Sequence, residues 1–172
     1  MLQVGEIWIN SPSKAIGYWG QKELSESDFH AKLASTSNSA TPETGYLRTG
    51  DLGFYYQDEL FICGRMKDLI IVRGSNHYPQ DIERTGEEVI KPIARAGCSA
   101  AFSVKDEAHP EAVVYIVEVR DEKLSKAECI TAAQSIKDAV ATTHGVSLRT
   151  ICILKPRTIP KTTSGKVARS WG

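Results

Sequence analysis

Short stretches in which polar and apolar residues alternate occupy much of the first third of the chain, and this alternation predicts β-strands. Residues 5–10 alternate in this way. Two further runs, residues 52–56 and 59–63, are rich in aromatic and β-branched side chains, and the polar pair Gln57 and Asp58 lies between them. This arrangement predicts a β-hairpin.

The stretch between these strands, residues 25–44, is rich in Ser, Thr and Asn, a composition typical of loops. Within it we expect one short helix over residues 27–33 and a surface loop at residues 35–39. The first third of the chain is therefore predicted to be mostly β-structure. It has few residues to cover its strands, so it looks like the end of a larger unit.

Strand and helix signals alternate in the second part of the chain. Residues 69–72 form an apolar run that Arg73 and Gly74 close, which predicts a strand. Pro79 suits the first turn of a helix, and an apolar stripe at helical spacing follows it. The stripe consists of Ile82, Gly86, Val89 and Ile93. Pro92 is expected to end or bend this helix.

Two strands and the clearest helix of the sequence come next. Residues 98–104 and 112–119 are β-rich runs separated by a polar turn at residues 106–110. The sequence at residues 125–128 is a capping box, which predicts the start of a helix, and Gly145 is expected to stop it. The apolar stripe of this helix consists of Cys129, Ala133, Ile136 and Val140.

Residues 147–154 predict a last strand, and one of its faces consists of Leu148, Cys152 and Leu154. Residues 69–154 thus give the order strand, helix, strand, strand, helix, strand. This order is compatible with a compact sheet that carries its helices on one face, although the order of the strands is left open. The expected fold class is α+β, with a small β-rich subdomain followed by a compact α/β domain.

The charge balance excludes several classes of protein. The 172 residues contain 21 Lys and Arg and 21 Asp and Glu, which argues against a nucleic-acid binder or a membrane-surface protein that relies on positive charge. The longest apolar run, residues 112–117, is too short to cross a bilayer, and no secretory signal is visible. The four cysteines and four histidines show no metal or disulfide spacing. We therefore expect a cytoplasmic protein without a metal site or a membrane span.

Three polar segments carry candidate chemistry. In the loop at residues 162–166, small residues allow an oxyanion to approach and Lys166 supplies a point charge; the alternative is a solvated surface lysine. Asp51 follows a Thr–Gly turn and can accept hydrogen bonds from two ribose hydroxyls, unless it only orders its own turn. Residues 64–68 place a glycine beside charged side chains, which suits a hinge or a polar linker.

Taken together, these segments resemble motifs of the adenylate-forming superfamily, which comprises acyl-CoA synthetases, luciferases and the adenylation domains of peptide synthetases. The resemblance rests on residues 5–8, 48–51, 64–68 and 160–166, which occur in the order of the family and at its approximate spacing. Within the superfamily, residues 68–83 look most like the fatty acyl-AMP ligases.

The resemblance implies a role for each of five residues. Asp51 would hold the ribose hydroxyls of AMP, Arg65 would lie near the ribose and phosphate, and Ile62 would line the nucleotide pocket. Lys67 occupies the position of the hinge between domains. Lys166 would be the lysine that bridges the substrate carboxylate and the α-phosphate during adenylation. A mobile ammonium group suits that step, because negative charge develops at the α-phosphate.

The resemblance also implies a domain organisation and a reaction. Residues 1–66 would be the last β-rich subdomain of a large N-terminal adenylation domain, and residues 67–172 would be the mobile C-terminal domain. The full protein would use ATP and Mg²⁺ to convert a fatty acid into acyl-AMP, and would pass the acyl group to the phosphopantetheine of an acyl carrier protein. The Mg²⁺ ligand would lie in the absent part of the N-terminal domain, so this fragment alone would be inactive.

Two alternatives remain, one a related enzyme and the other a protein of a different class. One is a long-chain acyl-CoA ligase that uses free CoA, and an insertion in the large domain would argue against it. The other is a non-catalytic acyl-adenylate-like module that serves protein interaction. The joint presence of Asp51, Arg65 and Lys166 speaks against such a module, because an interaction surface has no need of all three.

Overall fold

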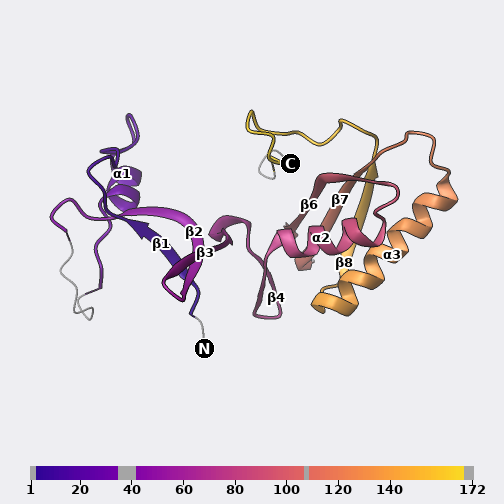
Figure 1. Ribbon diagram of the computed structural model, residues 1–172, viewed down its shortest axis with the longest axis horizontal. Helices are drawn as coiled ribbons and strands as arrows, with labels where there is room; N and C mark the ends of the chain where they lie inside the picture. Colours follow the sequence, from indigo (N-terminus) through magenta and orange to yellow (C-terminus); the bar gives the residue numbers. More distant parts are fainter. Residues whose placement is uncertain (1–2, 35–41, 107–108, 169–172) are drawn as a thin grey trace. The chain divides into compact units, whose positions relative to one another are not determined.

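The computed structural model of the chain (Figure 1) describes residues 3–34, 42–106 and 109–168. The surface loop expected at residues 35–39 lies outside the described residues. The chain divides into two compact units, Met1–Lys67 and Asp68–Gly172, which we call unit 1 and unit 2. Each sheet forms within one unit.

Unit 1 contains an antiparallel sheet in the order β1 (Gly5–Ile9), β2 (Leu47–Tyr56) and β3 (Glu59–Arg65). The predicted hairpin between β2 and β3 is confirmed, and both strands are longer than the aromatic runs that predict them. Gln57 and Asp58 turn the chain with φ angles of 51° and 63°. Both angles lie in the left-handed region that a two-residue type I′ turn requires.

The helix of unit 1, α1 (Lys22–Phe29), begins and ends earlier than the predicted span of residues 27–33. It ends at Phe29 because the chain then becomes extended. The backbones of Ala31 and Tyr46 exchange hydrogen bonds of 3.0 and 2.9 Å, which a helix through residue 33 would break. The prediction of a helix in this region is therefore right, but its position is wrong.

The main sheet of unit 2 contains β6 (Ala94–Asp106), β7 (His109–Val119) and β8 (Leu148–Leu154), in that order. β6 and β7 are antiparallel, and residues 107–108 between them lie outside the described residues. β7 and β8 are parallel, so they need a long crossover, and helix α3 (Lys126–His144) provides it.

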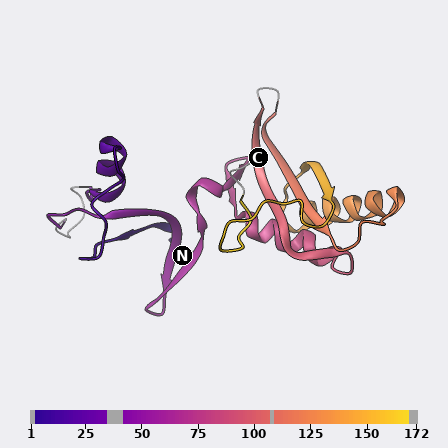
Figure 2. The ribbon, with the colours of Figure 1, turned by 90° about the horizontal axis from the view of Figure 1, so that it is seen from above.

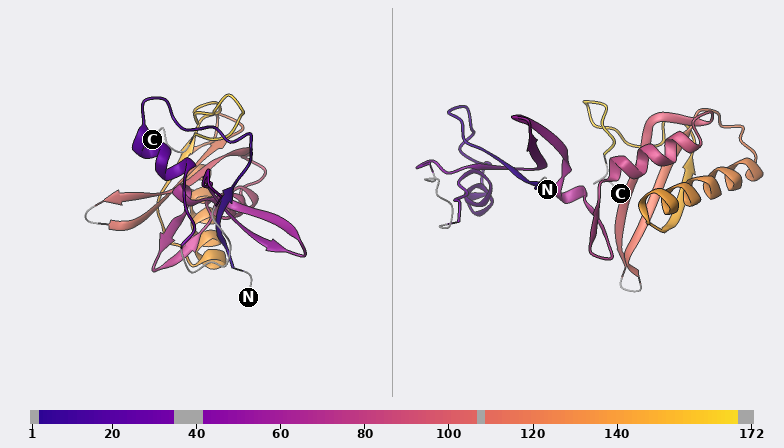
Figure 3. Two further views of the ribbon diagram at one scale, coloured as in Figure 1. Left: turned by 90° about the vertical axis from the view of Figure 1, so that its left-hand side faces the viewer. Right: turned by 60° about the horizontal axis from the view of Figure 1, so that its bottom comes forward.

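Helices α2 (Pro79–Val89) and α3 lie side by side on one face of this sheet (Figures 2 and 3). Pro79 begins α2 as predicted, and the helix ends before Pro92. The capping box predicted for α3 is present, and Gly145 ends that helix with a φ of 67°. The expected α+β class is confirmed. Among the described residues, none of the helices has the length and hydropathy of a membrane-spanning segment.

A small hairpin precedes α2 and pairs β4 (Ile70–Val72) with β5 (Ser75–His77), apart from the main sheet. Arg73 and Gly74 make its turn with φ angles of 50° and 73°. The sequence predicts β4 but not β5, because the polar residues of β5 lack the β-branched and aromatic side chains that mark a strand. The first strand of the predicted order therefore pairs locally and does not enter the main sheet.

The core of unit 2 lies between the main sheet and the two helices. Its buried side chains are Ile70, Ile82, Ile90, Ala94, Ala101, Val113, Tyr115, Val117, Ala132, Ile136, Val140, Val146 and Leu148. The predicted stripe of α3 is right for Ile136 and Val140, but Ala132 is buried with them and Ala133 is only half-buried. The predicted stripe of α2 extends too far, because the Val89 side chain is 43% exposed.

The face predicted for β8 is wrong after its first residue. Leu148 is buried in the core, but Ile151 and Ile153 pack beside it in place of Cys152 and Leu154. The cause is an irregularity in the pairing with β7: Val113 faces Leu148, whereas the next residue of β7 faces Thr150. One additional residue in β8 moves every later side chain to the other face of the sheet.

Two carboxylates of α2 bind backbone N–H groups of β6, one of the two outer strands of the main sheet. Glu83 accepts a hydrogen bond of 2.9 Å from the N–H of Ala101. Glu87 accepts one of 3.0 Å from the N–H of Gly97 and one of 2.5 Å from the Ser99 hydroxyl. The helix is thus tied to the sheet through polar groups as well as through its apolar stripe.

Candidate functional site

A bulge in β2 determines where the predicted ribose-binding residue lies. Glu6 of β1 faces Leu52 of β2, and Trp8 faces Arg48. Residues 49–51 therefore lie opposite a single residue of β1, and Gly50 takes a φ of 71°. A bulge of this kind turns a side chain out of the regular alternation of a strand. Asp51 is the last residue of the bulge.

Glu6 holds the bulge from the neighbouring strand. Its Oε1 accepts a hydrogen bond of 3.2 Å from the N–H of Gly50. Its Oε2 accepts hydrogen bonds from Trp8 Nε1 at 2.8 Å and from Arg48 Nε at 3.0 Å. The sequence shows only a glutamate in an alternating strand, and its contacts with Arg48 and Gly50 depend on pairing over more than forty residues. Sequence reasoning therefore missed this role.

Thr49 fixes the same bulge from within. Its hydroxyl donates to the carbonyl of Ile7 at 2.7 Å and accepts a hydrogen bond of 3.0 Å from the N–H of Asp51. The second contact, between residues two apart, is the kind that a Thr–Gly–Asp sequence favours. It is the one signal in the sequence that could have marked Thr49 as a positioning residue.

Asp51 and Arg65 are cross-strand partners and form an ion pair. Asp51 Oδ1 accepts a hydrogen bond of 3.1 Å from Arg65 Nε, and the two side chains are 37% and 63% exposed. An ion pair this exposed contributes only about 0–1 kcal/mol to stability. Its more useful effect is on orientation, because it holds one carboxylate oxygen of Asp51 and leaves the carboxylate accessible.

Ile62 lies on the same face of the hairpin as Asp51 and Arg65. Gly53 of β2 faces Ile62, whereas Leu52 faces Gly64, so Cys63 is an additional residue in β3. Without this irregularity, Ile62 and Arg65 would lie on opposite faces, since they are three residues apart. The Ile62 side chain is 69% exposed. The structure thus brings together the three residues predicted to bind the nucleotide.

Lys67, the predicted hinge, lies in a single 3₁₀ turn, η1 (Met66–Asp68). The division between the two units falls directly after it. Its side chain is exposed. The predicted site residue of unit 2 is Lys166, which therefore belongs to a different compact unit from Asp51, Arg65 and Ile62.

Lys166 lies at the end of a tight turn that Thr162 organises. The N–H of Thr162 donates to the carbonyl of Lys166 at 2.8 Å, and the N–H of Lys166 donates to the Thr162 hydroxyl at 3.2 Å. Gly165 allows the turn with a φ of 80°. The Lys166 side chain is exposed, and within the described part of the chain its Nζ has no hydrogen bond or ion pair. The backbone is fixed while the ammonium group stays available.

The turn belongs to a longer stretch, residues 155–168, which we call the lysine segment. Lys161 and Val167 pair as an isolated antiparallel bridge, and the N–H of Ala168 donates to the carbonyl of Pro160 at 3.0 Å. Ile159 and Ala168 are buried, with 6% and 9% of their surfaces exposed. The segment is therefore a small hairpin with a buried base and an exposed tip.

Glu118 of β7 fastens the lysine segment to the sheet. Its side chain is 1% exposed; Oε1 accepts a hydrogen bond of 2.7 Å from the N–H of Ile159, and Oε2 accepts one of 2.7 Å from Arg95. Burial by itself raises the pKa of Glu118, but hydrogen bonds from Ile159, Arg95 and the backbone of Arg157 outweigh burial and lower the pKa below its ordinary value of 4.5. Sequence reasoning missed Glu118, because the residue stands in an apolar strand and its partners are distant in sequence.

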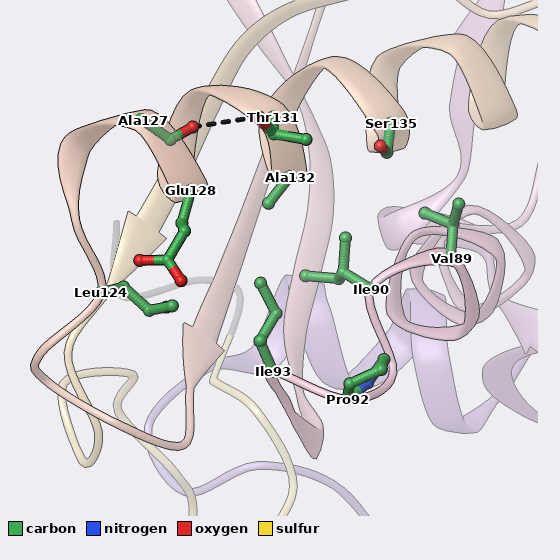
Figure 4. Close-up of a pocket in the computed structure, with 10 residues that line it drawn as sticks. All are labelled: Val89, Ile90, Pro92, Ile93, Leu124, Ala127, Glu128, Thr131, Ala132 and Ser135. Atoms are coloured by element: carbon green, nitrogen blue, oxygen red, sulfur yellow. Dashed lines mark hydrogen bonds between the residues drawn. The ribbon is translucent and has the colours of Figure 1, made fainter.

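A groove of about 400 Å³ lies between the end of α2 and the first half of α3 (Figure 4). Ile90, Ile93 and Ala132 point into it, and the carboxylate of Glu128 lies beside Leu124. None of the five predicted site residues lines this groove. Among the described residues, no group of three or more His, Cys, Asp or Glu side chains could hold a metal ion.

Comparison with known proteins gives consistent matches. A family model described as "Disco-interacting protein 2-like, AMP domain" matches residues 67–171. FadD21 of Mycobacterium leprae, named as a candidate fatty-acid–CoA ligase, is 45% identical over 98% of this chain and 28% of its own length. JamA of Moorena producens, a medium-chain-fatty-acid–[acyl-carrier-protein] ligase, is 42% identical over 98% of this chain and 27% of its own length.

A solved structure from work on fatty acyl-adenylate ligases of E. coli and L. pneumophila matches 98% of this chain and 26% of its own, with a TM-score of 0.75 and 32% identity. This chain therefore spans less than a third of the length of the relatives that it matches. The resemblance to fatty acyl-AMP ligases that the sequence motifs indicate is confirmed. Because the family model covers more than half of the chain, the chain belongs to the Disco-interacting protein 2-like AMP-domain family of adenylate-forming proteins.

Proposed function

We propose that this chain is the C-terminal part of a fatty acyl-AMP ligase. In the first half-reaction, a fatty-acid carboxylate oxygen attacks the α-phosphorus of ATP, and the bond from that phosphorus to the pyrophosphate oxygen breaks. Acyl-AMP and pyrophosphate form. In the second, the thiol of a phosphopantetheine attacks the acyl carbonyl, AMP leaves, and the thiol proton is released. Relatives named as fatty-acid ligases support this assignment.

The hairpin of unit 1 would bind the nucleotide. Asp51 keeps an accessible carboxylate whose orientation the bulge and Arg65 hold, and such a group accepts hydrogen bonds from two adjacent ribose hydroxyls. The guanidinium of Arg65, also exposed, suits the phosphate. Ile62 offers an apolar surface to the flat nucleotide on the same face.

The observation that carries the proposal is the turn at Lys166. Its backbone is fixed by Thr162, its ammonium group has no partner in the described part of the chain, and the residues around it are small. This combination favours a ligand that brings negative charge, since a cation held ready for a developing charge needs no reorganisation during the reaction. We assign to Lys166 the contact that bridges the carboxylate and the α-phosphate. ATP would come as its Mg²⁺ complex, with the metal ligand outside this chain.

The domain assignment is part of the same proposal. Residues 1–66 would be the last β-rich subdomain of the N-terminal adenylation domain, and residues 67–172 would be the C-terminal domain. That domain would rotate about Lys67 between the half-reactions. It would carry Lys166 to the α-phosphate for adenylation and away from it for transfer. Without the remaining part of the adenylation domain, the purified chain is expected to form no acyl-adenylate, because it cannot orient ATP.

The proposed acceptor is an acyl carrier protein. JamA is named as a ligase that acts on an acyl carrier protein, which supports this choice. FadD21, by contrast, is named as a fatty-acid–CoA ligase. The two acceptors can be distinguished by giving the full-length protein an acyl-adenylate together with either free CoA or a phosphopantetheinylated carrier protein, and measuring acyl transfer to each. A non-catalytic module would give no pyrophosphate release with any fatty acid.

The decisive experiment compares Lys166→Ala with Lys155→Ala in the full-length protein. Lys155 is an exposed lysine of the same segment, so its loss controls for surface charge. Lys166→Ala should slow pyrophosphate exchange by about 10²–10³-fold, the usual cost of losing one charge-stabilising donor. Acyl transfer from supplied acyl-AMP should be far less affected. Lys166→Arg should not restore the full rate, because a planar guanidinium cannot replace a compact ammonium. Near-normal exchange by Lys166→Ala would show that Lys166 is only a solvated lysine.

A further inference from the structure

The lysine segment is attached to the sheet at the buried carboxylate of Glu118, and Lys161 Nζ adds an exposed hydrogen bond of 3.1 Å to the carbonyl of Gly97. Both oxygens of Glu118 are used there: Oε1 binds the N–H of Ile159, and Oε2 binds the guanidinium of Arg95, each at 2.7 Å. Neither contact belongs to the core between the sheet and the helices. Glu118 lies on the opposite face of β7 from Tyr115, whose side chain faces the helices, because the two residues are three apart in the strand.

We propose that Glu118 and Arg95 are positioning residues for Lys166, acting through the base of the hairpin that carries it. This inference rests on the proposed function, since it assigns a cause to the placement of the lysine that acts in adenylation.

The path from Glu118 to Lys166 consists of contacts that leave little freedom. Ile159, which Glu118 holds, precedes Pro160 and Lys161, and these residues pair with Ala168 and Val167 on the returning arm. Lys166 directly precedes that arm, and its backbone is bonded to Thr162 on the first arm. Fixing the N–H of Ile159 therefore fixes the position from which the lysine side chain extends.

The chemistry at Glu118 requires a carboxylate. Three donors bind its two oxygens: the N–H of Ile159, the guanidinium of Arg95 and the backbone of Arg157. A glutamine offers one oxygen and one NH₂ group, so it would meet one of these donors with another donor. Glu118→Gln should thus release either the segment or Arg95 while it preserves the size of the side chain. A displacement of about 1 Å is enough to cost on the order of 10²-fold in rate.

The test measures both half-reactions of the full-length protein in four variants: Glu118→Gln, Lys166→Ala, the double variant, and Tyr115→Phe. Glu118→Gln should slow pyrophosphate exchange roughly 10–100-fold and leave acyl transfer from supplied acyl-AMP unchanged. A loss of stability alone would lower both. Tyr115→Phe is the matched control, because it also removes a buried hydrogen bond of β7, the one from the Tyr115 hydroxyl to the carbonyl of Glu83. It should leave both half-reactions unchanged.

The double variant decides whether Glu118 acts through Lys166. If it does, Glu118→Gln should have no further effect once Lys166 is alanine. Multiplied losses would overturn the inference, as would normal exchange by Glu118→Gln in an enzyme that Lys166→Ala slows. If Lys166→Ala itself exchanges pyrophosphate normally, the proposed function fails instead.

A second pair of variants keeps the test conclusive if Glu118→Gln does not fold. Arg95 is 42% exposed on its side chain, so changes there are easier for the fold to accept. Arg95→Met should slow exchange selectively, and Arg95→Lys, which keeps a cation for Oε2, should restore most of the rate. Equal rates for Arg95→Met and the unchanged enzyme would refute the role of the pair.

Discussion

Tyr115 and Glu118 lie three residues apart on β7 and are buried on opposite faces of the sheet. Burial leaves them in different protonation states. Tyr115 stays neutral: burial raises the pKa of its phenol, and its hydroxyl donates to the carbonyl of Glu83 at 3.1 Å. Glu118 stays charged, because a guanidinium and a backbone N–H occupy its oxygens. Burial favours the neutral form of a side chain unless donors and charges compensate the charged form.

The contact between Gly86 and Tyr115 predicts a large effect of one methyl group. A Cβ at Gly86 would collide with Cζ and the hydroxyl oxygen of Tyr115, which is fully buried and cannot move away. Gly86→Ala gains about 1 kcal/mol of helix propensity, but overpacking of this kind costs roughly 1–3 kcal/mol or more. Urea unfolding of the purified chain should show a net loss of stability. Gly5→Ala, where no atom lies within 4 Å of the new Cβ, is the control and should change little.

Glu118 makes the stability of unit 2 depend on pH. Its pKa lies below 4.5 in the folded protein, so the folded state binds the proton less tightly than the unfolded state. The stabilisation that the ionised Glu118 carboxylate provides is thus fully present above pH 4.5 and is lost as the pH falls through the lowered pKa. The stability difference between the unchanged chain and Glu118→Gln, measured by thermal unfolding, should shrink as the pH falls below 4.5. Glu122 is an exposed carboxylate of the loop after β7, and Glu122→Gln should not show this decrease of the stability difference with falling pH. A difference that is constant with pH would contradict the prediction.

At the scale of the site, sequence reasoning finds the residues with exposed functional groups and misses those that hold them. Asp51, Arg65 and Lys166 stand out because charged side chains beside Gly and Thr are visible in the sequence. Glu6 and Glu118 do not, since a glutamate in a strand is ordinary until its partners are known. Those partners come from other strands and from a loop, so only the folded chain identifies them.

Among the elements, the ones defined by local chemistry are predicted best. The capping box of α3 is an example: Ser125 Oγ accepts the N–H of Glu128 at 3.3 Å, and the Glu128 carboxylate accepts the N–H of Ser125 at 2.8 Å. By contrast, the later face of β8 depends on an additional residue near Thr150, which no local pattern marks. The end of α1 depends on pairing between Ala31 and Tyr46.

The capping box predicts a specific loss on mutation. Ser125→Ala removes the acceptor for the Glu128 N–H and should lower the free energy of unfolding by about 0.5–2 kcal/mol. Ser125→Thr should retain most of the free energy of unfolding, because a threonine side chain can also cap the N-terminus of a helix. Ser147→Ala, at an exposed position before β8, is the control. Equal stability of Ser125→Ala and the unchanged chain in urea would show that the box does not hold the helix.

The division after Lys67 governs predictions for the whole molecule. Lys67→Pro in the full-length protein restricts φ at this position to about −65°, which should favour one arrangement of the units. One half-reaction should therefore suffer much more than the other, as pyrophosphate exchange and acyl transfer would report. Lys67→Ala removes the side chain but leaves φ free, so it should affect both little. Equal losses in correctly folded Lys67→Pro would place the hinge elsewhere.

The contacts of α2 with β6, an outer strand of the main sheet, also bear on how this protein behaves at high concentration. An outer strand normally exposes unpaired N–H groups on which a second chain can form a new strand. Here the carboxylates of Glu83 and Glu87 already occupy the N–H groups of Ala101 and Gly97. An incoming strand would have to displace two negatively charged acceptors before it could pair. The helix thereby protects the β6 edge of the sheet against intermolecular strand addition and the aggregation that follows from it.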